Sequence, residues 1–202
     1  GPFVEVSAAY GLRYYEDELH PAFVDIDGDG RLDLAMSRLR GGSQIEFYIQ
    51  YADGTFVMQP YTVTGVDIEK PGPSVWWDID DDGDLDFFLA LDGGRSPGLL
   101  FRNEIGQGNG SLVLDLVGSP QRDAIGARVF LTTTTGRQMR EVQPTRGHYN
   151  PQSTRRLHFG LGGDSGAENV VIRWPNGEQQ ELGDVKADVR LRVVQGGAIT
   201  PF

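Results

Sequence analysis

DIDGDGRLD at residues 25–33 (loop 1) and DIDDDGDLD at residues 78–86 (loop 2) are two acidic stretches of nine residues each. Both follow the pattern D-x-D-x-D-G-x-L-D. Carboxylates this close together repel one another unless a cation lies among them. An acidic loop with a glycine at its sharp turn is typical of calcium, which takes about six to eight oxygen ligands. The two stretches therefore predict two calcium-binding loops.

The spacing predicts which oxygens would bind each ion. Alternate residues of a curled loop point inward, so positions 1, 3, 5 and 9 offer carboxylates and position 7 offers its backbone carbonyl. For loop 1, the predicted ligands are the carboxylates of Asp25, Asp27, Asp29 and Asp33 and the carbonyl of Arg31. For loop 2, they are the carboxylates of Asp78, Asp80, Asp82 and Asp86 and the carbonyl of Asp84, with Asp81 facing solvent.

The surroundings of the loops exclude an EF-hand. An EF-hand needs a glutamate at position 12, where this chain has Met36 and Leu89. The flanking segments 32–36 and 85–91 are short and apolar, which is typical of strands. Each loop is therefore expected to connect two strands of a β-sheet.

The loops belong to an internal repeat, because Asp25 and Asp78 stand 53 positions apart (78 − 25). At the same offset Leu34 aligns with Phe87, and residues 47–48 align with residues 100–101. A period of this length indicates repeated supersecondary units such as propeller blades.

Composition divides the 202 residues into two predicted domains, 1–105 and 106–202. The first holds 20 acidic and 7 basic residues, and the second holds 9 acidic and 11 basic. The 28 glycines and many short apolar runs predict an all-β fold, with about seven strands in the second domain, enough for a small β-sandwich.

The acidic first domain argues against a nucleic-acid partner. The absence of cysteine excludes disulfides and thiolate chemistry.

Three separated motifs in the second domain, at residues 122–129, 156–162 and 172–177, resemble the ASPIC/UnbV domain. The two acidic loops resemble FG-GAP (VCBS-type) repeats, and their order is similar to that of the cartilage acidic protein family. This resemblance implies a calcium-binding β-propeller of blade-like repeats joined to a transthyretin-like β-sandwich. It also implies a secreted, extracellular protein, or one that is periplasmic or at the cell surface.

The expected function is that of a non-enzymatic module for adhesion or for binding a protein or glycan ligand. We find no convergent catalytic set, and no apolar run predicts a membrane span. The opening Gly1-Pro2 is typical of a cleaved tag, which predicts a mature or excised chain.

Two alternatives stay open. The resemblance also implies an enzyme, or an accessory or scaffolding domain, in a biosynthetic pathway; a pocket holding His148 or His158 beside a carboxylate would favour it. Two repeats cannot close a propeller, so self-assembly into a homo-oligomer is the other alternative.

Five arginines make the middle of the second domain basic: Arg137, Arg140, Arg146, Arg155 and Arg156. Their expected role is that of ordinary solvated residues, some of them paired with the acidic first domain. An anion or acidic-glycan patch is the alternative.

Overall fold

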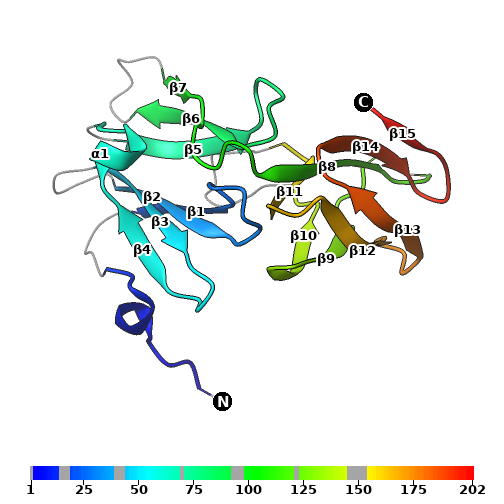
Figure 1. Ribbon diagram of the computed structural model, residues 1–202, viewed down its shortest axis with the longest axis horizontal. Helices are drawn as coiled ribbons and strands as arrows, with labels where there is room; N and C mark the ends of the chain where they lie inside the picture. Colours follow the sequence, from blue (N-terminus) through cyan, green and yellow to red (C-terminus); the bar gives the residue numbers. More distant parts are fainter. Residues whose placement is uncertain are drawn as a thin grey trace.

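The computed structural model describes residues 2–13, 19–38, 44–68, 71–91, 98–120, 123–144 and 154–202 (Figure 1). The fold is all-β, as predicted, and its strands form four sheets. A short 3-10 helix, η1 (Ser7–Tyr10), precedes them. Residues 3–6, where the alternation predicts a strand, are not a strand. All three apolar side chains there are exposed, so neither face of the segment is buried.

The first repeat is a four-stranded antiparallel sheet in the order β1-β2-β3-β4. Its strands are β1 (Leu19–Val24), β2 (Asp33–Arg38), β3 (Ile45–Gln50) and β4 (Phe56–Gln59). Loop 1 connects β1 to β2, as predicted. The β3–β4 hairpin turns at Gly54, whose φ of 84° suits glycine.

The second repeat is a three-stranded antiparallel sheet in the order β5-β6-β7, preceded by one helical turn, α1 (Tyr61–Thr64). Its strands are β5 (Pro71–Trp77), β6 (Asp86–Leu91) and β7 (Leu99–Phe101). Loop 2 connects β5 to β6. Residues 71–73 have the sequence Pro-Gly-Pro, which favours a turn, but they begin β5. The register of β5 against β6 shifts between Pro71 and Ser74. A strand accepts proline at such an irregularity, because proline has no N–H to donate to the neighbouring strand.

The two repeats share one hydrophobic core. Strands β1 and β2 pack against β5, and one cluster of buried residues draws on both sheets. At its centre the ring of Trp76 stacks on Phe87 with centroids 4.7 Å apart and meets Phe47 edge-on at 6.2 Å. The repeats are therefore stabilised by each other and not only by their own strands.

The second half of the chain is a sandwich of two four-stranded sheets, ordered β10-β9-β12-β13 and β11-β8-β14-β15. Their bounds are β8 (Gly110–Val117), β9 (Arg128–Thr133), β10 (Gly136–Glu141), β11 (Leu157–Gly162), β12 (Gly166–Arg173), β13 (Gln179–Lys186), β14 (Val189–Val194) and β15 (Ile199–Pro201). The sequence predicts about seven of these strands and misses β15, which is exposed along its whole length and so carries no alternating pattern. A core that includes Trp174 and Phe159 lies between the sheets.

The two halves lie side by side, and β8 leads from the first half into the sandwich (Figure 1). Strand β11 forms one edge of its sheet. This edge comes to lie against the two acidic loops, which places the candidate site between the halves of the molecule.

Candidate metal centre

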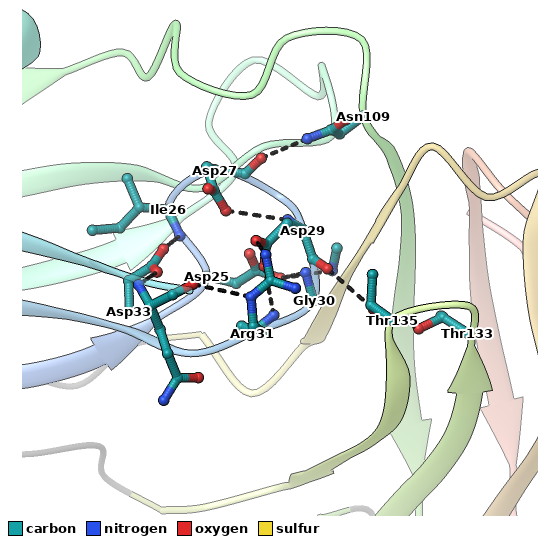
Figure 2. A network of polar contacts seen from close by, with 12 residues as sticks. Asp25, Ile26, Asp27, Asp29, Gly30, Arg31, Asp33, Asn109, Thr133 and Thr135 are labelled. Carbon is teal, nitrogen blue, oxygen red and sulfur yellow. Dashed lines mark hydrogen bonds and ion pairs between the residues drawn. The ribbon is translucent and has the colours of Figure 1, made fainter. Parts of the chain in front are cut away.

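Loop 1 brings three of its predicted ligands together. Oxygen atoms of Asp25, Asp27 and Asp29 lie within 4.8 Å of one another. Asp25 is only 2% exposed. Its Oδ2 atom accepts a hydrogen bond from the Gly30 amide at 3.0 Å, so the carboxylate is fixed at the mouth of the turn (Figure 2).

Asp33, the predicted ligand at position 9, is not part of that trio. Its side chain is fully buried, and both of its oxygens accept backbone N–H bonds. The Ile26 amide donates to Oδ2 and the Gln50 amide to Oδ1, each at 2.8 Å. Asp33 therefore braces the loop against β3. Each of its oxygens retains a second lone pair, so its role as a ligand stays a prediction.

Loop 2 repeats this construction with one difference. The converging oxygens belong to Asp78, Asp80 and Asp86. Asp86 is the equivalent brace, accepting from the Ile79 amide at 2.8 Å and the Asn103 amide at 2.7 Å. In this loop the brace also belongs to the acidic trio, whereas Asp82 at position 5 does not.

The remaining predicted residues are placed as follows. The guanidinium of Arg31 forms an ion pair with Asp29. Asp82 is exposed, whereas the side chain of Asp84 is buried. Asp81 is exposed, as predicted, although it also forms an ion pair with Arg190. The carbonyl roles of Arg31 and Asp84 stay predictions.

In both loops, buried carboxylate oxygens without hydrogen bonds and carboxyl groups with raised pKa values are what a cation site would need. Among the described residues, the buried oxygens Asp25 Oδ1, Asp78 Oδ1 and Asp84 Oδ1 have no hydrogen-bond partner. Burial raises the pKa of Asp25 to about 7, and the neighbouring Asp29 and Asp27 carboxylates contribute. Burial and the nearby Asp82 charge raise the pKa of Asp84 to about 8. A donor set made only of oxygens suits a hard cation such as calcium.

Family comparisons agree with this arrangement. A model of the FG-GAP-like repeat matches residues 25–89, and a model described as ASPIC and UnbV matches residues 118–200. The chain joins an FG-GAP-like repeat to an ASPIC and UnbV domain. The architecture predicted from the sequence motifs is thus confirmed, and it suggests an extracellular β-rich binding module. No curated protein matches the chain.

The ASPIC and UnbV domain contributes one arginine to each loop of the FG-GAP-like repeats. Arg140 donates to the Gly30 carbonyl at 3.3 Å, and its Nη2 atom lies 4.0 Å from Asp25 Oδ2. Arg190 donates to Asp78 Oδ2 at 2.6 Å. Sequence reasoning anticipated arginines paired with the acidic half but missed Arg190, because nothing local distinguishes it from Arg192 two residues later.

The other predicted arginines do not form an anion patch in the described part of the chain. Arg155 pairs with Asp123, and the guanidinium of Arg156 lies 4.8 Å from the centre of the Phe202 ring. Arg137 is exposed at the start of β10. Arg146 lies outside the described residues.

Of the two histidines singled out by the sequence, His148 lies outside the described residues and His158 is buried. The Nε2 atom of His158 lies 2.7 Å from the Gly83 carbonyl oxygen of loop 2. His158 also lines a cleft of about 460 Å³ between the halves, together with Asp25, Arg140 and Glu141. No helix among the described residues is both long and apolar enough to cross a membrane.

Proposed function

We propose that the protein is a non-enzymatic, calcium-binding extracellular module for adhesion or for binding a protein or glycan ligand. One observation carries the proposal: each loop gathers three carboxylates within 4.8 Å while buried carboxylate oxygens in the same loop lack hydrogen bonds. Buried charges of one sign are costly unless a counter-charge accompanies them. A calcium ion in each loop would supply that charge.

The ions would have a structural role. Asp25, Asp27 and Asp29 would hold one ion, and Asp78, Asp80 and Asp86 the other, with the remaining predicted oxygens completing each shell. Binding to the folded state alone raises stability by mass action, by about 2.7 kcal/mol per site when calcium is 100-fold above its dissociation constant.

The repeats also offer a surface for a partner. Phe23 on β1 is 61% exposed, and Tyr61, Val63 and Leu100 are exposed on the same half of the molecule. Exposed apolar side chains are available for contact with a partner. They support a ligand-binding role, and they equally suit packing against further copies of the chain. Light scattering across a concentration series distinguishes these roles: a constant monomer mass removes self-assembly.

The calcium sites are tested by removing one predicted ligand from each loop, the half-buried Asp27 and the exposed Asp80. Asp27→Ala and Asp80→Ala should each reduce two bound ions to one, and each should lower the melting temperature in calcium but not in chelator. Titration calorimetry of chelator-stripped protein measures the ions. Asp53→Ala is the control, because Asp53 is acidic and exposed in the β3–β4 turn and belongs to neither trio. Two ions and an unchanged melting temperature in the variants would contradict the ligand assignment.

The enzyme alternative draws on the cleft that holds His158 beside Asp25 and Glu141. The hydrogen bond of His158 to the Gly83 carbonyl commits one ring nitrogen to the protein itself, which favours a structural role. A small molecule that stabilises the wild type and Arg173→Ala but not Arg156→Ala would favour the alternative. Arg156 lines the cleft, whereas Arg173 lies over Phe130 on another face.

A further inference from the structure

One edge of strand β11 is not paired with another of the described strands. The strand pairs with β8 on one side, and on the other side its backbone donors meet loop 1. The Gly160 amide donates to Asp25 Oδ2 at 3.1 Å, and the Gly162 amide donates to the Gly28 carbonyl at 2.9 Å. An open strand edge is a template for unwanted pairing. Here the acidic loop covers that edge and satisfies its donors.

The approach of the two backbones depends on glycine. A Cβ atom on Gly160 would overlap Asp25 Oδ2 and the Gly28 carbonyl. A Cβ atom on Gly30 would lie 3.0 Å from the Gly160 oxygen, and Gly30 also has a φ of 93°. Glycines on both partners therefore let a strand of one domain lie directly against a cation loop of the other.

The same strand reaches the second loop. His158, two residues before Gly160, contacts the Gly83 carbonyl through Nε2 at 2.7 Å. His158 makes this contact with its side chain, whereas Gly160 and Gly162 contact loop 1 through their backbone amides. One strand of the ASPIC and UnbV domain thus contacts both acidic loops.

The contact between β11 and loop 1 fixes the carboxylate of Asp25, a predicted calcium ligand. Its Oδ2 atom accepts one N–H from its own loop, at Gly30, and one from the other domain, at Gly160. Two donors on one oxygen fix the carboxylate, and Oδ1 is left without a hydrogen bond among the described residues. A ligand held in its binding geometry before the ion arrives costs less to order when the ion binds.

We propose that β11 couples cation binding to domain docking: its 158–162 edge completes loop 1 as a calcium site, and the bound ion in turn secures β11 against the repeats. This inference rests on the proposed function, because it requires calcium in the loops. Coupling is reciprocal, so the factor by which docking strengthens calcium binding equals the factor by which calcium strengthens docking. Gly160 is a positioning residue here and not a ligand.

The first test is hydrogen exchange of the full chain, stripped with chelator and then saturated with calcium. Calcium should slow exchange in the 157–163 segment by about tenfold, a typical coupling factor, although this segment supplies no predicted calcium ligand. If calorimetry shows calcium binding but exchange in this segment does not change, the coupling is wrong and the proposed function stands. If calorimetry shows no binding, both fail.

The second test compares two glycines near the end of β11. Gly160→Ala should weaken one calcium site by about tenfold and abolish the calcium-dependent protection of residues 157–163. Gly163→Ala should change neither, because a Cβ atom at Gly163 meets nothing within 4 Å. Wild-type affinity at both sites in a folded Gly160→Ala protein overturns the proposal. The exchange test on the wild type decides the question if that variant does not fold.

Discussion

Loop 1 and loop 2 share nine-residue patterns that are almost identical, yet they lie in different surroundings. In both loops the aspartate at position 9 accepts one amide of the loop and one amide 17 residues further along, at Gln50 and Asn103. In loop 1 the first aspartate receives its second donor from a backbone amide, and Asp25 is buried while Asp27 and Asp29 are half-buried. In loop 2 an arginine is that donor, and residues 80–82 are exposed. The pattern thus encodes the brace, whereas the neighbouring domain sets the charge around each site.

The largest loss of stability should come from removing the aspartate at position 9, which accepts two backbone amides in both loops. Asp33→Ala and Asp86→Ala each leave two backbone amides without their acceptor, which costs about 2–6 kcal/mol at roughly 1–3 kcal/mol per buried group. Urea unfolding should show this loss in chelator for both variants, and a further loss in calcium for Asp86→Ala, which also removes a proposed ligand. Asp184→Ala is the control, because its carboxylate accepts a single amide at the exposed surface. A loss seen only in calcium would mean that position 9 acts as a ligand rather than as a brace.

A smaller effect should appear with pH in chelator, where loop 1 and loop 2 both hold carboxylates with raised pKa values. Burial raises the pKa of Asp25 and of Asp33 to about 7, from 3.8. The folded protein therefore holds protons that the unfolded chain releases, and the free energy of unfolding should fall as pH rises from about 4 to about 7.

Saturating calcium should remove this fall, because the ion replaces the protons among the carboxylates. Urea unfolding between these pH values, with and without calcium, measures both slopes. A fall of equal size in calcium would show that the ion does not occupy the sites where the raised pKa values lie.

The smallest effect should come from the arginine that donates to the first aspartate of loop 2, where loop 1 has a backbone amide. Arg190→Gln removes a cation that pairs with Asp78, so calcium should bind loop 2 about two- to fivefold more tightly while loop 1 keeps its affinity, as expected for a partly exposed ion pair. Arg192→Gln is matched to it, because Arg192 lies on the same strand as Arg190 and pairs with Asp115 of β8 instead of with a loop. Weaker binding at loop 2 in Arg190→Gln would mean that the arginine positions Asp78 rather than opposing the ion.

Elements that depend on residues close together in the chain could be predicted from the sequence. The alternation of carboxylates with a glycine at position 6 indicated both loops, and the apolar runs beside them indicated β2 and β6. The 53-residue period also implied that Asp33 and Asp86 would behave alike, as they do. Locally encoded turns and strands can be predicted because their residues contact neighbours close in sequence.

The contacts between the loops and the second domain depend on the tertiary structure. The contacts of Gly160 with Asp25 and of Arg190 with Asp78 join residues more than a hundred positions apart, and no pattern in the chain marks either pair. The edge strand β11 needs acceptors for its outward amides, and the acidic loops need donors and positive charge. Only the folded chain brings these two requirements together, and it thereby places both candidate calcium sites against the second domain.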